Sequence, residues 1–422
     1  MPLPDEFLWG VSTSAFQIEG AFTEGGRGPS VWDKFSPVRD DDTAEIACDH
    51  YHRYPEDIAL MKDLGVGAYR FSIAWPRIQP NGKGPANAEG LDFYDRLVDS
   101  LVEAGIDPVA TLYHWDTPQL LEDEGGWLGR DITGRFADYA GLVADRLADR
   151  VKLWMPINEP VVVTLSGYAI GEHAPGKSLL FGSLPAAHHL NLAHGLAAQA
   201  LHAAGANAVG TANNHTPAWP ASDSPEDQAA AGYYDAIHNW LFADPQLTGR
   251  YPDGFADFLP VVDGDLETIA APLDFYGMNY YNPTRLRATA ERDPLPFERI
   301  EIDEYPKTSF GWPVVPAGLT EMLTQLQERY GDRLPPVYIT ESGCSCPEDL
   351  ADQARIDYLD GHIKAARAAG VRGYFVWSIM DNFEWDSGYS QRFGLVHVDY
   401  KTQERTPRDS YRWYQDVIAR KS

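Results

Sequence analysis

One pattern repeats eight times along the 422-residue chain and limits the folds open to it. A short β-branched or aromatic run is followed each time by a longer amphipathic stretch. The runs are mostly continuous rather than alternating, which is typical of parallel strands buried on both faces. We expect strands at residues 7–14, 68–73, 108–113, 151–157, 208–213, 275–280, 336–340 and 373–378.

The stretches between these runs carry apolar residues at the i, i+3, i+4 spacing of a helix. The clearest sets are Tyr94, Leu97, Val98, Leu101 and Val102; Phe136, Tyr139, Val143 and Leu147; and Ile356, Leu359 and Ile363. Gly105 and Gly370 stand where such helices would end before the next strand.

Eight strand–helix units predict an α/β fold, specifically a (β/α)8 TIM barrel. A bare barrel needs about 250 residues. We therefore expect one domain over residues 1–422 with long strand-to-helix loops, one of them between Pro160 and the fifth strand.

Charge and cysteine content limit the partners. Acidic residues outnumber basic ones by 62 to 34, a net charge of −28, which disfavours nucleic acid and anionic membrane surfaces. The chain has no apolar run of 18 residues, and its first residues lack the pattern of a signal peptide. Three cysteines suit a reducing compartment, so we expect a cytoplasmic protein. The sequence leaves the oligomeric state open.

Polar and aromatic residues gather where the predicted strands end. Catalytic groups of a (β/α)8 barrel lie at the carboxyl ends of its strands. A single polar residue after a strand is usually just solvated, but seven of the eight strands show the same feature. The candidates are Gln17, Arg70, His114, Trp115, Asn158, Glu159, Asn279, Tyr281, Glu341, Trp377, Glu384 and Trp385.

Two of these candidates, Glu159 and Glu341, follow the fourth and seventh strands and can face each other across a barrel. Paired carboxylates that flank a glycosidic bond hydrolyse it. A separation of about 5–5.5 Å would give retention of configuration through a nucleophilic carboxylate, and about 6.5–9.5 Å would give inversion. The surrounding aromatic rings and neutral polar groups suit a sugar.

The chain resembles glycoside hydrolase family 1, the β-glucosidase family, from end to end. The motifs that carry the resemblance are FLWG at 7–10, FQIEG at 16–20, YRFSIAWPR at 69–77, HWD at 114–116, NEP at 158–160, TESG at 340–343 and WSIMDNFEW at 377–385. The resemblance implies a retaining β-glycosidase, most simply a β-glucosidase that cleaves terminal non-reducing β-D-glucosyl groups from short oligosaccharides and aryl or alkyl glucosides. It implies a small-molecule β-glycoside as the partner and no cofactor or metal.

The resemblance also implies a role for each matching residue. Glu341 would be the nucleophile and Glu159 the acid/base, with a raised pKa on Glu159. Arg70 and Tyr281 would support the nucleophile, and Asn158 would hold the 2-hydroxyl. The substrate-binding set would be Gln17, His114, Trp115, Asn158, Asn279, Trp312, Trp377, Glu384, Trp385 and Phe393.

Single residues discriminate between branches of this family. The intact Glu384-Trp385 pair argues against 6-phospho-sugars, because an anionic glutamate would repel phosphate. Glu159, rather than a glutamine, favours O-glycosides over thioglucosides. Glucosides, galactosides and fucosides stay open, as does transglycosylation, and a sugar-binding protein without turnover is the alternative of another class.

Other residues depart from the family pattern or suggest a metal. Residues 344–347 (CSCP) and 177–185 depart from it. Cys344 and Cys346 lack a second pair of ligands at metal-binding spacing. His188, His189 and His194 do not share a helix face, so we expect them to be structural.

Overall fold

The computed structural model describes residues 6–289 and 295–420. Residues 1–5, part of the segment expected to lack signal-peptide character, lie outside this range. Eight parallel strands form one curled sheet in the order β4-β3-β2-β1-β11-β10-β7-β5. They are β1 (Leu8–Ser12), β2 (Ala68–Ser72), β3 (Asp107–Tyr113), β4 (Leu153–Ile157), β5 (Asn213–Asn214), β7 (Tyr276–Asn279), β10 (Val337–Ser342) and β11 (Gly373–Trp377).

The two ends of this sheet meet, which closes the barrel. Parallel bridges join Trp154 to Val209 and Asn158 to Ala212. The amide of Trp154 donates to the Ala208 carbonyl at 2.9 Å, and that of Glu159 donates to the Ala212 carbonyl at 2.8 Å. The (β/α)8 prediction is therefore confirmed.

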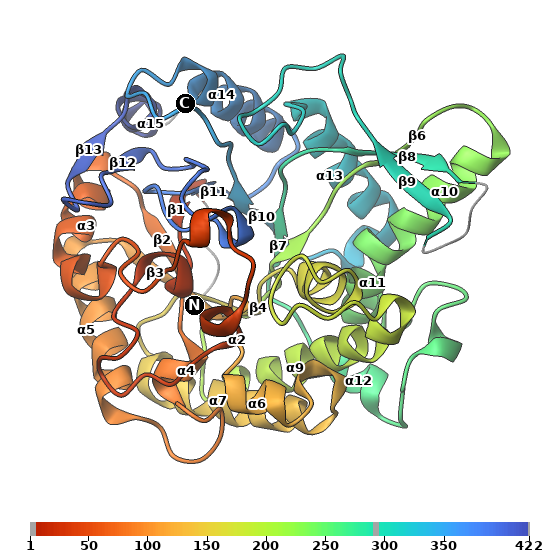
Figure 1. Cartoon of the computed structure of the whole chain (residues 1–422), viewed down its shortest axis with the longest axis horizontal. Helices are drawn as coiled ribbons and strands as arrows, with labels where there is room; N and C mark the ends of the chain where they lie inside the picture. The colour runs from red at the N-terminus through yellow and green to blue at the C-terminus, as the bar shows by residue number, and fades with distance from the viewer. Residues whose placement is uncertain (1–5, 290–294, 421–422) are drawn as a thin grey trace.

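Helices surround the strands on the outside (Figure 1). The longer ones are α3 (His50–Leu64), α5 (Ala88–Ala104), α7 (Asp131–Leu147), α9 (Leu184–Ala203), α10 (Pro225–Asp235), α11 (Leu241–Thr248), α13 (Pro316–Tyr330), α14 (Gln353–Ala368) and α15 (Asp409–Ala419). Short ones are α1 (Ala15–Ile18), α2 (Val31–Lys34), α4 (Trp75–Ile78), α6 (Gln119–Asp123), α8 (Pro160–Val162) and α12 (Asp265–Ile269). Gly105 and Gly370 adopt φ 79° and 78° at the ends of α5 and α14, as predicted.

The most informative differences from the sequence prediction concern the fifth strand, the seventh strand and helix α5. The fifth strand is expected over 208–213, but only Asn213–Asn214 forms a strand and the rest pairs through single bridges. Gly210 lies so close to the Phe275 carbonyl that a Cβ there would come within 2.5 Å of the oxygen. The seventh strand, β10, continues two residues further than expected and includes Glu341. Val102, expected in the apolar stripe of α5, is 48% exposed.

The surplus residues also lie in more places than expected. Residues 160–207 are largely helical and contain α8, a π-helical segment η3 (Val163–Ala169) and α9. Two more insertions follow strands β5 and β7. They contain α10, a second π-helical segment η5 (Ala236–Trp240) and a sheet of β6 (Ala218–Pro220), β8 (Thr284–Ala288) and β9 (Phe297–Ile300). Strands β12 (Val396–Val398) and β13 (Arg405–Pro407) pair beside the barrel.

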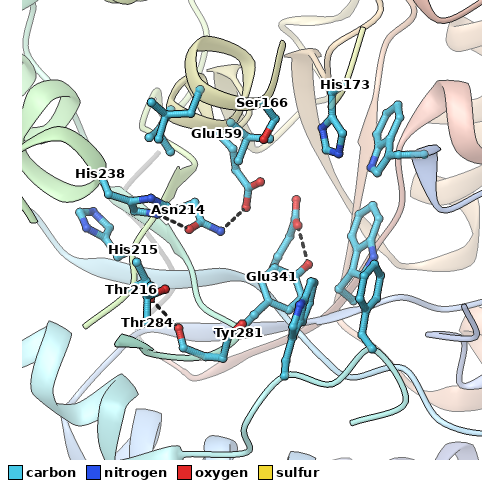
Figure 2. Close-up of a pocket in the computed structure, with 18 of the residues that line it drawn as sticks. Glu159, Ser166, His173, Asn214, His215, Thr216, His238, Tyr281, Thr284 and Glu341 are labelled. Carbon is cyan, nitrogen blue, oxygen red and sulfur yellow. Dashed lines mark hydrogen bonds between the residues drawn. The ribbon is translucent and has the colours of Figure 1, made fainter. Parts of the chain in front are cut away.

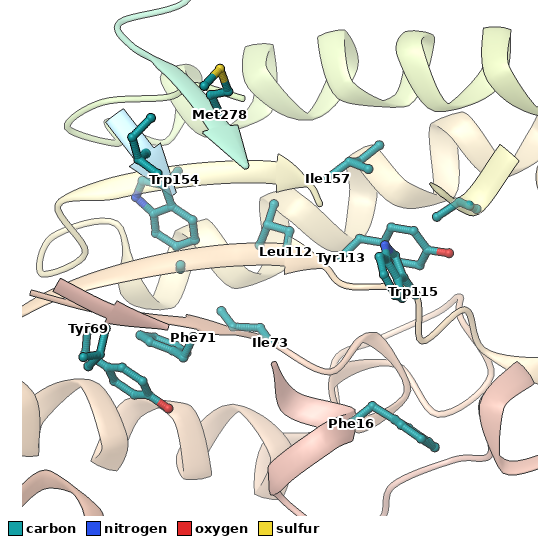
Figure 3. Packing of buried hydrophobic residues seen from close by; sticks show 14 of the residues in the cluster. Phe16, Tyr69, Phe71, Ile73, Leu112, Tyr113, Trp115, Trp154, Ile157 and Met278 are labelled. Carbon is teal, nitrogen blue, oxygen red and sulfur yellow. The ribbon is translucent and has the colours of Figure 1, made fainter. Parts of the chain in front are cut away.

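The core has two layers because strand side chains alternate. Ala68 and Val109 belong to a cluster of nine buried residues, whereas their neighbours Tyr69 and Ala110 belong to the larger cluster that packs under the helices (Figure 3). The smaller cluster fills the barrel interior, as layered side chains do in this fold. Arg70 is two residues beyond Ala68 and therefore points to the same interior side. In the described part of the chain, no helix combines the length and apolarity needed to cross a membrane.

Candidate active site

A cavity of about 270 Å³ opens at the carboxyl ends of the barrel strands. Ten predicted residues line it: His114, Trp115, Glu159, Tyr281, Trp312, Glu341, Trp377, Glu384, Trp385 and Phe393. The other four, Gln17, Arg70, Asn158 and Asn279, are fully buried just behind this lining. The structure thus brings all the predicted residues to one place, and Glu159 and Glu341 point toward each other across the cavity (Figure 2).

Arg70 connects the groups beneath the cavity. One guanidinium nitrogen, Nη1, donates to Oε1 of Glu341, and the other, Nη2, donates to Oδ1 of Asn158 at 2.7 Å. Its Nε donates to Thr111 Oγ1 at 3.1 Å. Every nitrogen of this buried cation therefore has an acceptor, which a buried charge requires.

Glu159 is held by two amides. Asn279 Nδ2 donates to its Oε1 at 2.8 Å, and Asn214 Nδ2 donates to the same oxygen at 2.9 Å. The residue itself adopts φ 45° and ψ 62°, a left-handed conformation that is uncommon outside glycine. Trp115 and Trp385, at φ 77° and 51°, share this property, so three lining residues are held in costly backbone conformations.

Glu341 has different partners from Glu159. Oε1 receives the Arg70 guanidinium, and Oε2 accepts a hydrogen bond from Tyr281 O–H at 2.9 Å. Burial raises the pKa of Glu341, while Arg70 and Tyr281 oppose that rise by favouring the charged form.

The two carboxyl groups are therefore unequal. Burial, followed by the charge of Glu341, raises the pKa of Glu159 to about 8. Among residues 6–289 and 295–420, Glu159 has no ion pair comparable to the Arg70–Glu341 pair. When the two groups hold one proton between them, the proton resides on Glu159. The bonds from Asn214 and Asn279 occupy Oε1, so the remaining oxygen, Oε2, is the one free to carry the proton.

His114 presents a hydrogen-bond donor that has no acceptor in the part of the chain that the structure describes. Asn158 Oδ1 accepts from Arg70 and Asn279, so its amide Nδ2 faces His114 Nε2, at 3.1 Å. That nitrogen is then the acceptor, which places the ring proton on Nδ1. Burial, and then Arg70, lowers the pKa of His114 well below its usual value, so the ring is neutral. Its Nδ1 is buried without a hydrogen-bond partner.

Aromatic rings form the rest of the wall. The His114 ring stacks against Trp377 and Trp385, with centroids 5.7 and 5.9 Å apart. Trp312 stacks on Phe310, with ring centroids 4.5 Å apart, and its ring centroid lies 6.1 Å from that of Phe393. Flat apolar faces of this kind suit the C–H face of a sugar ring.

The charge of Glu384 differs from the sequence interpretation, which treats it as an anion. Burial, and then the charges of Asp386, Glu341 and Glu159, raise its pKa to about 8, so it is mostly protonated at pH 7 in the empty cavity. Gln17 Nε2 lies 3.5 Å from its Oε2. A phosphate dianion would still be repelled, because Asp386 and Glu341 supply the two strongest negative charges that act on Glu384.

The sequence analysis did not predict the part of the cavity lining that lies next to Glu159 and includes Asn214. Asn214 directly follows the predicted fifth strand, the one strand end left without a candidate, and the polar run Asn213–Thr216 was the available signal. The cavity lining also includes Ser166, His173, Thr216, Tyr234, His238, Asn282, Thr284 and Arg299. Most of these lie on the insertions after β4, β5 and β7, where no repeating pattern marks them.

The residues considered for metals do not form a cluster. In the described ranges, no group of three or more His, Cys, Asp or Glu side chains is arranged to hold a metal ion. Cys344 and Cys346 are buried free thiols with sulfur atoms 3.7 Å apart. His188 and His189 are buried and bonded to protein groups, namely Tyr251, Asp265 and the Trp127 carbonyl.

A (β/α)8 barrel with two unequal carboxyl groups facing each other in an aromatic-lined cavity defines a glycosidase. The model of the family described as glycosyl hydrolase family 1 matches residues 1–422. The chain belongs to this family and is therefore a retaining O-glycosyl hydrolase.

Named relatives cover nearly the whole chain. Beta-glucosidase A of Acetivibrio thermocellus is 41% identical over 98% of both chains. A bifunctional beta-D-glucosidase/beta-D-fucosidase of Bifidobacterium breve is 43% identical over 99% of this chain and 98% of its own. The solved family 1 β-glucosidase from Thermotoga maritima superposes with a TM-score of 0.94 at 40% identity, covering 100% of this chain and 99% of the other.

Proposed function

We propose that the chain is a β-glucosidase that removes terminal β-D-glucosyl groups from short oligosaccharides and from aryl or alkyl glucosides. The carrying observation is the unequal pair: Glu341 is joined to the buried Arg70 guanidinium, whereas Glu159 has a pKa raised to about 8. This division of charge suits a nucleophile and a general acid.

In the proposed first step, Glu341 attacks the anomeric carbon. Glu159 donates its proton from Oε2 to the glycosidic oxygen, so the leaving group departs as a neutral alcohol. The product is a covalent glycosyl ester on Glu341, and Tyr281 and Arg70 stabilise the charge as the bond forms and later breaks. In the second step, Glu159, now ionised, takes a proton from water, which attacks the same carbon and restores both residues.

The sugar would occupy the end of the cavity lined by Trp377, with the Trp377 indole beneath its ring. His114 Nδ1–H is a buried donor without an acceptor, and a sugar hydroxyl would supply one. Asn158 would hold the 2-hydroxyl, while Gln17, Asn279, Glu384 and Trp385 would complete the recognition of the remaining hydroxyls. Trp115 would support this end, and Trp312 and Phe393 would contact the aglycone.

The experiment is the variant Glu341→Gln, assayed on an aryl β-glucoside. Hydrolysis should be abolished, because an amide cannot form the glycosyl ester. The matched control is Glu328→Gln, an exposed position on α13, which should keep full activity. Retained activity in Glu341→Gln would refute the assignment of the nucleophile. A panel of aryl β-glucoside, β-galactoside and β-fucoside, together with cellobiose, tests the sugar preference.

We also propose that residues 1–422 form a single catalytic domain and that the enzyme acts in the cytoplasm. Its substrates would be small β-glucosides that include cello-oligosaccharides. Three free, buried thiols suit a reducing compartment. A cavity of about 270 Å³, near the lower end of small-molecule pockets, suits short substrates. The charge of −28 argues against nucleic acid as a partner. Activity found mainly outside the cytoplasmic fraction would contradict this location.

A further inference from the structure

A chain of polar side chains runs from Glu159 outward to Arg299. Asn214 Nδ2 lies 2.9 Å from Glu159 Oε1, and Asn214 Oδ1 lies 2.8 Å from His238 Nε2 (Figure 2). His238 Nδ1 then lies 3.1 Å from the Tyr234 hydroxyl, which in turn lies 3.3 Å from Arg299 Nη2. These residues come from four different elements: the end of β5, α10, η5 and β9.

The chemistry of each group fixes the direction of every bond. Oε1 of Glu159 accepts from both Asn279 and Asn214, so Asn214 turns its amide nitrogen to Glu159 and its oxygen to His238. His238 Nε2 must then carry the ring proton, which leaves Nδ1 as an acceptor for the Tyr234 hydroxyl. Arg299 only donates, so it donates to the Tyr234 oxygen. All four groups donate toward Glu159.

This arrangement requires a neutral His238, and its surroundings keep it neutral. Burial, and then the charges of Arg299 and His215, lower its pKa well below the usual value. The ionisable groups that act on Glu159 from the other side are Glu341 on β10 and Arg70 on β2. His238 is therefore a fixed donor near neutral pH rather than a titrating one.

The local fold holds His238 and Asn214 in register. Tyr234 and His238 are four residues apart, and their rings stack with centroids 5.3 Å apart. His238 lies in the π-helical segment η5, a distortion often found at functional sites. The next residue, Asn239, ties this segment to the residues just after β5, because its side chain pairs with the backbone N–H and carbonyl of Thr216 at 3.0 and 2.8 Å.

We propose that His238, fixed by Tyr234 and Arg299, is a positioning residue that locks the amide of Asn214 and thereby sets the orientation and proton affinity of Glu159. The inference rests on the proposed role of Glu159 as acid/base. With the His238–Asn214 hydrogen bond in place, Oε1 of Glu159 is always an acceptor. The Glu159 proton therefore stays on Oε2 and faces the cavity. Without this hydrogen bond, the Asn214 amide can rotate and present Oδ1, which favours a proton on Oε1, where it cannot reach the glycosidic oxygen.

The test compares the wild type with His238→Leu, His238→Gln and Tyr234→Phe. Each is assayed against pH on two aryl β-glucosides, one with a poor leaving group that needs protonation and one with a dinitrophenolate leaving group that does not. Leucine removes the donor, whereas glutamine restores an N–H near the position of Nε2. Tyr233→Phe is the matched control, because Tyr233 packs its ring against Phe255 and Phe297.

His238→Leu should lower kcat/KM on the poor leaving group about tenfold, a fraction of the ~10²–10⁴ that a general acid contributes. On the good leaving group the change should stay below about twofold. The alkaline limb of the kcat/KM profile should move up by about 0.5–1 pH unit, the shift expected when one hydrogen bond to a carboxylate weakens. His238→Gln should recover most of the loss, Tyr234→Phe should show the same changes at smaller size, and Tyr233→Phe should match the wild type.

Equal losses on both substrates with an unmoved alkaline limb would overturn the proposal, as would a glutamine variant no better than leucine. Should His238→Leu fail to fold, Tyr234→Phe, which removes one oxygen atom, tests the same hydrogen-bonded chain with the same two substrates. A failure of the proposed function would look different: Glu159→Ala would keep full activity on the poor leaving group.

Discussion

The floor and the outer wall of the cavity are built in different ways. The floor consists of Arg70, His114, Asn158, Asn279 and the two glutamates, all within barrel strands or directly after them. The outer wall consists of Asn214, Tyr234, His238, Arg299 and Trp312, and most of it lies on the insertions after β5 and β7. Both regions touch Glu159, the floor through Asn279 and the wall through Asn214.

The difference separates the groups that act on the reacting bond from most of the groups that would contact the aglycone, and Asn214 connects the two. The floor is buried and interlinked by hydrogen bonds around Arg70, so its groups keep a fixed geometry for the bonds that break. The outer wall lies on short helices and strands within the insertions that follow β5 and β7. Such insertions can vary in sequence and length without disturbing the barrel strands. If this division is correct, changes in the floor should act on the bond-breaking steps, and a change at Trp312 in the wall should depend on the size of the aglycone.

The largest effect is expected from Glu159→Ala in the floor. Loss of the general acid should lower kcat/KM by about 10²–10⁴ on glucosides with poor leaving groups and far less on a dinitrophenyl glucoside. Added azide should replace the missing base and yield a β-glucosyl azide, identified by NMR. An α-configured azide would contradict a retaining reaction.

Tyr281→Phe should have the next largest effect. Its hydroxyl donates to Glu341 Oε2 at 2.9 Å, and a hydrogen bond to a charged group contributes about 1.5–3 kcal/mol. We expect kcat/KM to fall by about tenfold or more for all substrates alike. The neighbouring Tyr280→Phe is the matched control, since its hydroxyl donates to the Val315 carbonyl instead. Tyr280→Phe should lower Tm and leave kcat/KM nearly unchanged. If Tyr280→Phe lowered kcat/KM and Tyr281→Phe did not, the assigned role of Tyr281 would be wrong.

A smaller and selective effect is expected from Trp312→Ala in the outer wall. An aromatic contact is worth about 0.5–1.5 kcal/mol, so KM for cello-oligosaccharides or large aryl aglycones should rise by about 2–10-fold. Methyl β-glucoside, whose aglycone is too small to reach the wall, should show little change. Equal losses on both substrates would erase the distinction between floor and wall.

The smallest effect is on stability, through Glu384→Gln. The pKa of Glu384 is raised to about 8 in the folded state, above its value in the unfolded chain. The folded state therefore holds the proton more tightly, and this residue's contribution to the free energy of unfolding falls as pH rises from about 4.5 to 8. Glutamine removes that loss, so Tm should increase relative to wild type by about 1–3 °C at pH 8.5 and by less at pH 5.5. Calorimetry at both pH values checks this, and an equal shift at both would show that the carboxyl group does not carry the effect.

Much of the floor could be predicted because each of its residues lies in or directly after a strand that has its own sequence signal. Glu159 ends the apolar run at 151–157, and Glu341 lies in the run that begins at residue 336. Parallel strands bring their carboxyl ends to one edge, so position along the chain becomes position in space. The fifth strand, which pairs mostly through single bridges, was predicted without a candidate residue at its end, and Asn214 was missed there.

The sequence by itself determined the barrel, the family and the edge at which the polar residues gather, because these depend on local periodicity and on motifs contiguous in the chain. The tertiary structure decided how each group is charged and oriented. Glu159 and Glu384 are the same residue type as Glu341, yet only Glu341 receives the Arg70 guanidinium, while burial raises the pKa of the other two to about 8. His238 is an ordinary helical residue in the sequence, and only the meeting of four separate elements places its N–H against Asn214. Burial and long-range hydrogen bonds are properties of the folded chain, and they give identical side chains different protonation states and different roles.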